Sequence, residues 1–344
     1  MSNLKVLVTA DINREEIETI KGIDIKYAGY ILDYQVIDRM LLIEKCKDKD
    51  ILVSEYDTVD KAVMDNASNL KLIVCCRGGV KSVVDLDEAS RRGILVCNTP
   101  GRNANSVSDM TVGMLIDVAR NISKANMQIF NKIITSDTSS KPSEYKDTVW
   151  GLDAESPFVK LRGFQLKDRK LGLIGFGAVG RLVAEKVKPF GIKVAVYDPF
   201  LKPEQLPEDV QLIPTINELV GMSDFISLHC AVTDQTEGMF NAEMFAKMKD
   251  GAFFINTARG VLVNENDLVA ALNSGKLGGA AMDVACIEPI PSDSPLLTAQ
   301  NLVLTPHIAG SSQEVKDEGT HMAAESIRTF MAGEKPSHCI NWIE

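Results

Sequence analysis

Short apolar segments recur along the chain, and helical patterns lie between them. The first set comprises residues 6–8, 51–53, 72–75 and 95–97, with amphipathic stretches at 14–20 and 35–44. The second set comprises residues 171–174, 194–197, 225–228, 253–255, 280–283 and 302–304. Short buried strands that alternate with helices are typical of βαβ units and a parallel sheet. We therefore predict an α/β protein with two doubly wound parallel-sheet domains.

The segments between and after the two sets predict how the domains are connected. Asn98-Thr-Pro-Gly101 is a turn that ends the first set, and a long helix is expected from Asn105 or Ser106, either of which can cap it. Beyond Pro306 one strong helical pattern remains, at residues 312–331, which is too little for a domain of its own. We therefore expect residues 1–103 and 308–344 to form one domain and residues 104–307 to form the other.

Residues 135–167 break the pattern. They are polar, contain Pro142 and Pro157, and show weak periodicity. Loops of this length without secondary structure are uncommon in compact domains. We interpret the segment as an arm that packs on a neighbouring subunit, and a disordered insert is the alternative.

Composition narrows the class of protein. The 344 residues, 45% hydrophobic and 24% charged, exclude a disordered, collagen-like or disulfide-built chain. The formal net charge of −10 makes nucleic acid an unfavourable main partner, but it does not exclude acidic small molecules as ligands. The seven cysteines are scattered without metal-type spacing, so no metal site is predicted. Neither a signal peptide nor a membrane helix is expected, and we predict a cytoplasmic protein.

A dinucleotide site is predicted directly after the apolar segment at 171–174. The sequence Gly175-Phe-Gly177-Ala178-Val179-Gly180 matches the Gly-x-Gly-x-x-Gly fingerprint, with a strand before it and a helix after it. Gly175 would make the tight turn, Gly177 would admit the pyrophosphate, and Gly180 would let helix and strand pack closely. The helix N-terminus would supply unpaired N–H groups for the anion.

Asp198 indicates which cofactor is bound. It follows the next strand, and a carboxylate there accepts hydrogen bonds from a ribose diol and repels a 2′-phosphate. Pro199 and Phe200 come next, and no arginine is present to hold that phosphate. We therefore predict NAD rather than NADP.

Further motifs resemble those of the D-isomer-specific 2-hydroxyacid dehydrogenase family. They are Gly251-Ala-Phe-Phe-Ile-Asn-Thr257-Ala258-Arg259-Gly260, Gly279-Ala-Ala-Met-Asp283-Val284 through Glu288-Pro289, and Thr305-Pro306-His307-Ile-Ala-Gly310. The similarity runs from about residue 70 to 326 in the family's order and spacing. The resemblance implies a Rossmann NAD-binding domain inserted in a flavodoxin-like substrate domain. It also implies NAD-dependent hydride transfer between a D-2-hydroxy acid and its 2-oxo acid.

The chemistry of three residues agrees with that implication. Arg259 can bind a carboxylate through two parallel hydrogen bonds and polarise the neighbouring carbonyl. His307 can give a proton to the carbonyl oxygen or take one from the hydroxyl. Glu288 would hold the imidazole and favour its protonated form, as reduction requires. Relatives that oxidise formate have glutamine at the position of Glu288, which argues against that activity here.

The resemblance also assigns cofactor contacts. Asp283 matches the residue that holds the nicotinamide carboxamide. His229, Cys230 and Thr233 match a loop under the adenosine, although the family usually has proline where Ala231 stands. The remaining matched positions are Thr257, Ala258 and Gly310.

The predicted substrate loop departs from the family. The family commonly has Gly-x-Gly-x-Asp-Asn-x-Asp, whereas this chain has Arg77-Gly78-Gly79-Val80-Lys81 without the Asp-Asn pair. Gly78, Gly79 and Val80 can still form an anion-binding nest of backbone N–H groups. Arg77 resembles a substrate-phosphate residue of phosphoglycerate dehydrogenases, and one interpretation is therefore a phosphorylated substrate. Two ordinary solvated cations are the alternative interpretation of Arg77 and Lys81.

Two rival functions compete with the dehydrogenase interpretation. Some members of this fold family are NAD-sensing corepressors that bind peptides, and the residues above do not exclude such a role. An L-specific lactate or malate dehydrogenase has its fingerprint near the N-terminus, whereas here it begins at Gly175. The resemblance suggests a homodimer joined through the cofactor domain.

Overall fold

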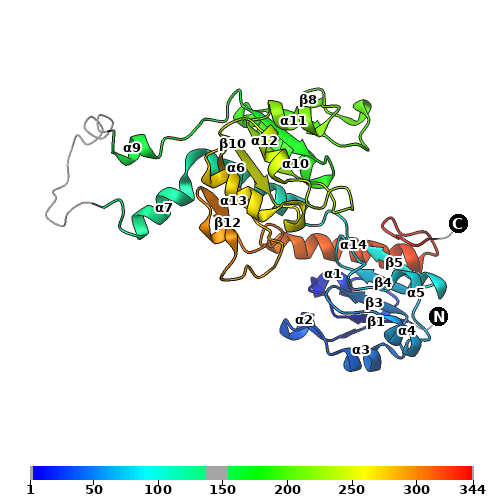
Figure 1. The fold of residues 1–344 in the computed structure, drawn as a ribbon. Coiled ribbons are helices and arrows are strands. Elements are labelled where there is room, and N and C mark those ends of the chain that lie inside the picture. The colour runs from blue at the N-terminus through cyan, green and yellow to red at the C-terminus, as the bar shows by residue number, and fades with distance from the viewer. Residues whose placement is uncertain (1–2, 136–153, 343–344) are drawn as a thin grey trace. The chain divides into compact units, whose positions relative to one another are not determined.

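The computed structural model describes residues 3–135 and 154–342. The chain divides into two compact units, Met1–Asn103 with Ser311–Glu344, and Ala104–Gly310 (Figure 1). The sequence placed the second boundary after His307, a little earlier along the chain. Of the predicted arm at 135–167, residues 136–153 lie outside the described residues.

The first unit is built on a five-stranded sheet in the order β2-β1-β3-β4-β5, and every neighbouring pair is parallel. This is the flavodoxin-like strand order, and it confirms the predicted fold class. The edge strand β2 was not predicted, because its sequence Ile-Asp-Ile-Lys-Tyr alternates instead of forming an apolar run. The strands are β1 Leu4–Val8, β2 Ile23–Tyr27, β3 Ile51–Ser54, β4 Leu72–Cys75 and β5 Leu95–Asn98.

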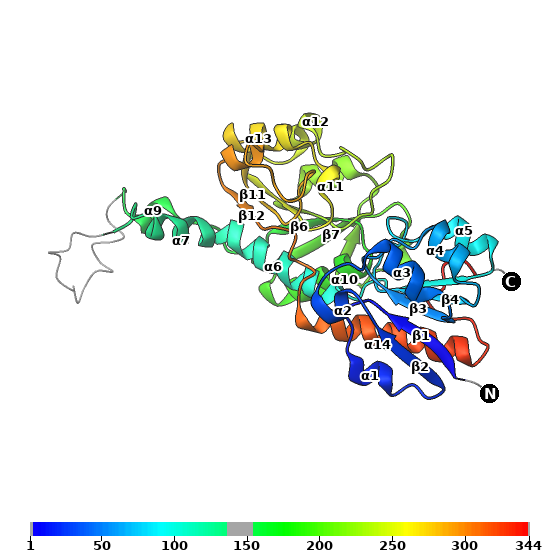
Figure 2. The same cartoon turned by 90° about the horizontal axis from the view of Figure 1, so that it is seen from below.

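Helices cover both faces of this sheet (Figure 2). On one face α1 and α14 pack against β1, β3 and β4, and on the other face lie α3, α4 and α5. The helix expected at 35–44 begins only at Arg39, because the Asp38 carboxylate caps it by accepting the N–H groups of Met40 and Leu41. The helices are α1 Arg14–Glu18, α2 Tyr30–Asp33, α3 Arg39–Cys46, α4 Lys61–Asn66, α5 Leu86–Arg91 and α14 Gln313–Met331.

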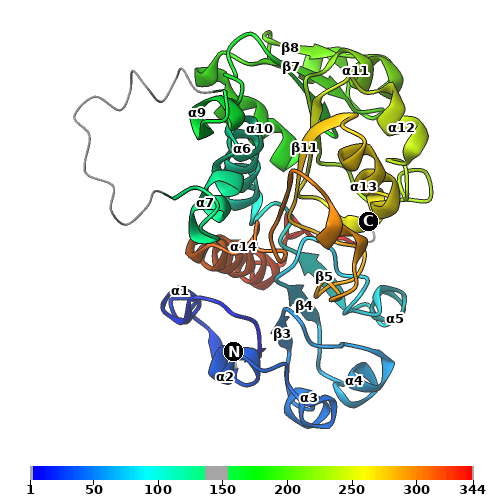
Figure 3. The ribbon, with the colours of Figure 1, turned by 60° about the vertical axis from the view of Figure 1, so that its left-hand side comes forward.

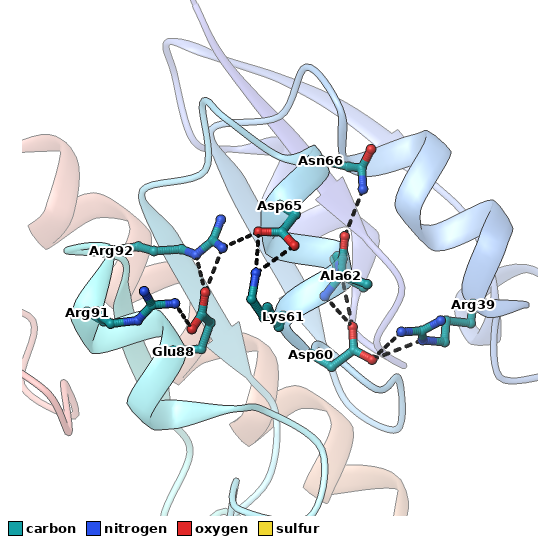
Figure 4. Close-up of polar contacts among 10 residues, drawn as sticks. Arg39, Asp60, Lys61, Ala62, Asp65, Asn66, Glu88, Arg91 and Arg92 are labelled. Carbon is teal, nitrogen blue, oxygen red and sulfur yellow. Dashed lines mark hydrogen bonds and ion pairs between the residues drawn. The ribbon is translucent and has the colours of Figure 1, made fainter.

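Charged side chains on the outer surface of α3, α4 and α5 pair with one another (Figure 4). Arg39 reaches Asp60, the residue that caps α4, with Nη2 2.5 Å from Oδ2. Arg92 donates to Glu88 on α5 at 2.6 Å and also to Asp65 on α4. Exposed ion pairs contribute little individually, so we assign this network a minor role in stability.

The second unit has a seven-stranded parallel sheet in the order β12-β11-β10-β9-β6-β7-β8. The strand order reverses at β6: β7 and β8 are added on one side of it, and β9 to β12 are added on the other side. Ligands of such sheets bind where the strand order reverses. The edge strand β8, Val-Gln-Leu, was again not predicted, because three residues give no detectable period. The strands are β6 Lys170–Ile174, β7 Lys193–Tyr197, β8 Val210–Leu212, β9 Phe225–Leu228, β10 Ala252–Asn256, β11 Leu277–Met282 and β12 Leu302–Leu304.

Helices cover both faces of this second sheet (Figure 3), and an apolar core lies between each layer of helices and the sheet. The long helix α6 and the helix α10 cover one face, and α11, α12 and α13 cover the other. Within the described residues, no helix combines the length and apolarity needed to span a membrane. The helices are α6 Ala104–Arg120, α7 Ile122–Phe130, α9 Pro157–Lys160, α10 Ala178–Val187, α11 Ile216–Met222, α12 Ala242–Lys247 and α13 Glu265–Asn273.

Candidate active site

The glycine-rich turn joins β6 to α10 at the strand-order reversal. Gly175 has φ 93°, and a Cβ there would lie 2.6 Å from the carbonyl oxygen of His229. A Cβ on Gly180 would lie 2.5 Å from the carbonyl oxygen of Gly175. Gly177 caps α10, and nothing lies within 4 Å of where its Cβ would be. Two of these glycines therefore allow close packing, and the third leaves room at the helix N-terminus, where Ala178 and Val179 begin the first turn.

Asp198 follows β7 and holds the glycine turn in place. One carboxylate oxygen accepts the N–H of Phe176 at 2.9 Å, and the other accepts the N–H of Phe200 at 3.0 Å. The side chain remains partly exposed. Since each carboxylate oxygen has two acceptor sites, Asp198 keeps capacity for the hydroxyls of a ribose.

The loop after β9 lies against the glycine turn. The backbone N–H of His229 donates to Ile174 at 2.8 Å, and its ring Nε2 lies 2.9 Å from Ser227 Oγ. Burial lowers the pKa of His229 to about 3, so this imidazole is neutral at physiological pH and cannot serve as the proton donor. Burial also raises the pKa of the Cys230 thiol to about 11. Thr233 starts a tight turn, its N–H donating to Thr236 Oγ1 at 2.8 Å.

The segment after β10 is fixed by Asn256, a buried residue to which the sequence interpretation gave no role. Its amide accepts the N–H of Ala258 and donates to the carbonyl of Arg259, both at 2.9 Å. Thr257 is also buried, and its hydroxyl lies 2.8 Å from that of Thr111 on α6. Arg259 itself is exposed, with Nη1 2.5 Å from the Ala258 carbonyl oxygen. Hydrogen bonds therefore hold the backbone of this segment, while the Arg259 side chain is exposed.

Gly260 brings this segment against the loop that carries Glu288. A Cβ on Gly260 would lie 2.0 Å from the carbonyl carbon of Ala285, so only glycine fits. The N–H of Ala285 in turn donates to Glu288 Oε1 at 3.0 Å. Gly260 thus connects the position of Arg259 to that of Glu288.

Glu288 and His307 form a close pair, with Oε2 2.6 Å from Nδ1. Burial by itself would raise the pKa of Glu288. The hydrogen bond with His307, the N–H of Ala285 and the charge of Arg259 outweigh that effect and lower it. Glu288 is therefore ionised at neutral pH, and Nδ1 of His307 is oriented toward it. This leaves Nε2 of the imidazole for a reacting group.

Asp283 anchors the segment that carries His307. Its carboxylate is 1% exposed and accepts hydrogen bonds from Thr305 Oγ1 at 2.6 Å, Ile308 N at 2.9 Å and Ala309 N at 2.8 Å. Its backbone carbonyl also accepts the N–H of His307 at 2.7 Å. His307 has φ 57°, which is uncommon for a residue other than glycine. The sequence did not indicate this anchoring role, and Thr305 was not assigned to the site.

The predicted substrate loop is a separate group in the first unit. Gly78 and Gly79 are exposed and Val80 is buried, and no described residue accepts a hydrogen bond from the N–H of any of the three. Asn98 holds the loop by donating to the carbonyl of Gly78 at 2.6 Å. The guanidinium of Arg77 lies 5.4 Å from the ring centroid of Tyr56. Unpaired N–H groups on consecutive residues suit an anion.

The structure therefore groups the predicted residues by unit. Arg259, Asp283, Glu288 and His307 all lie in the second unit, at or beyond the carboxyl ends of its strands, together with the glycine turn and Asp198. Gly310 is the last residue of that unit. This sheet, turn and acid define the second unit as the dinucleotide-binding domain of an α/β dehydrogenase.

Comparison with known proteins identifies the family. Residues 112–309 match the model of the D-isomer specific 2-hydroxyacid dehydrogenase NAD binding domain. The chain belongs to this family, and it is an NAD-dependent D-2-hydroxyacid dehydrogenase.

Three similar proteins illustrate the match. A D-3-phosphoglycerate dehydrogenase of Methanocaldococcus jannaschii is 33% identical over 98% of this chain, which spans 59% of that protein's length. A glyoxylate reductase of Thermococcus litoralis is 33% identical over 98% of this chain and 96% of its own length. The solved structure of the TT0316 protein from Thermus thermophilus has a TM-score of 0.78 and 30% identity, covering 98% of this chain and all of that one.

Proposed function

We propose that this enzyme interconverts a D-2-hydroxy acid and its 2-oxo acid, with Arg259 and His307 as the groups that contact the substrate. The observation that carries this proposal is the pair formed by His307 Nδ1 and Glu288 Oε2 at 2.6 Å, with the charge of Arg259 acting on the same carboxylate. NADH supplies the hydride when it is bound. The glycine turn, Asp198 and the loop at 229–233 are the residues that would hold it.

Each of the three residues has one task in reduction. The Arg259 guanidinium binds the substrate carboxylate and draws electron density from the adjacent carbonyl. His307, protonated and held through Nδ1, donates its Nε2 proton to the carbonyl oxygen as that oxygen gains charge. Glu288 stabilises the imidazolium before transfer and keeps the ring oriented. In the oxidation direction His307 accepts the hydroxyl proton through the same atom.

A His307→Gln variant tests this assignment. Glutamine keeps a polar side chain of similar reach but cannot transfer a proton at neutral pH. We expect kcat to fall by about 10²–10⁴, the usual contribution of a positioned acid–base group, while the dissociation constant for NADH, measured by protein fluorescence quenching, stays unchanged. A variant with near-wild-type kcat would show that another group is the donor.

For the substrate, we propose a 2-hydroxy acid that carries a second anionic group, as 3-phosphoglycerate does. Support comes from the N–H groups of Gly78, Gly79 and Val80, which no described residue uses, and from the positive charge of the preceding residue, Arg77, whose guanidinium lies 5.4 Å from the Tyr56 ring centroid. The relatives named above act on phosphoglycerate in one case and glyoxylate in the other, so both kinds of acid belong in the test.

An Arg77→Gln variant distinguishes these substrates. If Arg77 binds a phosphate, kcat/KM for the phosphorylated acid falls at least tenfold, because a charge-assisted hydrogen bond contributes about 1.5–3 kcal/mol. The kcat/KM for an unphosphorylated 2-oxo acid stays within about twofold. Equal losses for both substrates would contradict the phosphate assignment and leave the dehydrogenase assignment intact.

We also infer that two copies of the chain associate through α7 and its surroundings. Helix α7 continues beyond the end of α6 (Figure 2), and none of its residues is buried. Phe130 is 78% exposed, Ile133 69%, Phe158 60% and Met127 57%. Exposed apolar surface of this kind marks an interaction site. The cytoplasmic location stays a prediction.

Light scattering coupled to size exclusion tests this association. The unaltered protein should elute at twice its 37.6 kDa chain mass. A Phe130→Glu variant should elute as a monomer, because it places a charge in the apolar contact. A monomeric unaltered protein would contradict the inference.

A protein that binds peptides in response to NADH but turns over no acid would instead support the corepressor-like alternative.

A further inference from the structure

The segment after α14 pairs with the outer edge of β5 in the first unit (Figure 1). The N–H of Asn98 donates to the carbonyl of His338 at 3.1 Å, and the N–H of Ile340 donates to the carbonyl of Val96 at 2.9 Å. These two bonds define an antiparallel bridge in which Cys97 faces Cys339. The two cysteines are far apart in sequence and opposite each other in the fold.

The type of bridge determines how close the two thiols lie. Both hydrogen bonds are made by the residues on either side of the cysteines, so Cys97 and Cys339 form a non-hydrogen-bonded antiparallel pair. The α-carbons of such a pair are typically about 4.5 Å apart, and its side chains lie closer together than in the hydrogen-bonded type. Disulfides need α-carbons about 4.4–6.8 Å apart. The α-carbon spacing typical of this type of bridge therefore falls within the range that a disulfide needs.

A second set of contacts fixes the tail in this register. The Asn341 side chain accepts the N–H of Val96 at 2.8 Å and donates to the carbonyl of Ile94 at 2.8 Å and to Ser90 Oγ at 3.1 Å. The tail is therefore held to both ends of the segment that precedes Cys97. A slip of one residue would break all of these bonds, so the two sulfur atoms stay opposite each other.

The two thiols differ in access. Cys97 is fully buried, and burial, followed by the neighbouring Cys339, raises its pKa to about 12. Cys339 is partly exposed, and its thiol lies 3.7 Å from Asn341 Oδ1. A reagent in solution can therefore react with Cys339 directly. Cys97 can then react with the disulfide that has formed on Cys339.

We propose that Cys97 and Cys339 form a thiol–disulfide exchange site that fastens the tail covalently to β5. The oxidant is a small-molecule disulfide such as oxidised glutathione. The Cys339 thiolate attacks one of its sulfur atoms, forming a mixed disulfide and releasing one thiolate. Cys97 then gives its proton to that thiolate and attacks Cys339 Sγ. The bond between Cys339 Sγ and the small molecule breaks and releases a second thiolate, which takes up the proton that Cys339 lost. Two electrons pass from the cysteine pair to the small disulfide, which becomes two thiols.

This site is independent of the proposed reaction, since both cysteines lie in the first unit whereas Arg259, Glu288 and His307 lie in the second. Its structural consequence falls on β5. Next to Cys97, Asn98 donates to the carbonyl of Gly78, and Thr99 N donates to the carbonyl of Arg77 at 3.0 Å. A covalent bond at Cys97 would therefore restrain the strand end that holds the loop at 77–80.

Peptide mapping of the folded, full-length protein tests the proposal. The protein is incubated with oxidised glutathione, quenched with an alkylating reagent and digested without reduction. We expect a peptide pair joined through Cys97 and Cys339 that separates on adding dithiothreitol, and a fall from seven free thiols to five. A Cys339→Ser variant should lose the crosslink and keep its remaining thiols reduced.

Two further variants keep the result interpretable. Cys286→Ser removes an exposed cysteine of the second unit, and it should leave the crosslink at its unaltered yield. In Cys97→Ser, Cys339 should accumulate as the mixed disulfide with glutathione, because the second step is blocked. If unaltered protein also accumulates that mixed disulfide, or if Cys339 reacts no faster than Cys286, the exchange site is refuted.

Discussion

Replacing Asp283 with asparagine tests how the candidate proton donor is positioned. The Asp283 carboxylate is buried and accepts three hydrogen bonds from the segment that carries His307. Asparagine keeps one oxygen, which can still serve Thr305 and Ile308, but it places an NH₂ group opposite the N–H of Ala309. One charge-assisted bond is lost, and a buried donor is left without an acceptor.

The size of the effect follows from that loss. A hydrogen bond to a charged group is worth about 1.5–3 kcal/mol, and about 1.4 kcal/mol corresponds to a factor of ten in rate. His307 has φ 57°, so once the anchor weakens its backbone relaxes toward commoner conformations. We therefore expect kcat to fall by roughly ten- to a hundredfold, with the dissociation constant for NADH nearly unchanged.

The assay separates anchoring from cofactor binding. Kcat is measured at saturating NADH, and the dissociation constant by fluorescence titration. Thr305→Val removes one donor to Asp283 and should lower kcat by a smaller factor, whereas Thr305→Ser keeps the hydroxyl and should retain wild-type kcat. If Asp283→Asn instead weakens NADH binding tenfold while kcat holds, the carboxylate acts on the nicotinamide, as the family resemblance implies, and the anchoring argument fails.

Three other substitutions have defined outcomes. Glu288→Gln should lower kcat, because a neutral amide replaces the carboxylate that lies 2.6 Å from His307 Nδ1 and holds the ring; an unchanged kcat would count against the pair. Gly260→Ala should abolish activity and lower Tm, because its Cβ would overlap the Ala285 backbone, whereas Gly113→Ala, with open space at its Cβ, should leave both intact. Asp198→Ala should narrow the preference for NAD over NADP, measured as the ratio of the two kcat/KM values, and an unchanged ratio would remove Asp198 from the discrimination.

The sequence predicted the fold through its buried strands. Interior strands such as residues 72–75 of β4 and residues 253–255 of β10 are continuous apolar runs, because parallel strands inside a sheet are covered on both faces. The edge strands β2 and β8 were missed since they are alternating or very short. The start of α3 was misplaced because Val36 and Ile37 continue the apolar pattern into a segment that Asp38 excludes from the helix.

The candidate site residues that could be predicted from the sequence are those that stand in short local motifs. Arg259, Glu288 and His307 could be selected from local sequence, since each stands in a distinctive context of neighbours. The contacts that join distant segments could not be found in this way. Asp283 reaches residues 305–309, and Cys97 meets Cys339, only because strands separated in sequence lie side by side. Such pairings depend on register, which composition and period do not reveal.

The most direct test of the central claim is NADH oxidation, followed at 340 nm, with a panel of 2-oxo acids that includes phosphorylated members. We predict that at least one acid of the panel is reduced, that the product is the D-isomer, and that His307→Gln loses this turnover while it still binds NADH. An enzyme that binds NADH and reduces none of these acids, or that forms the L-isomer, would contradict the account.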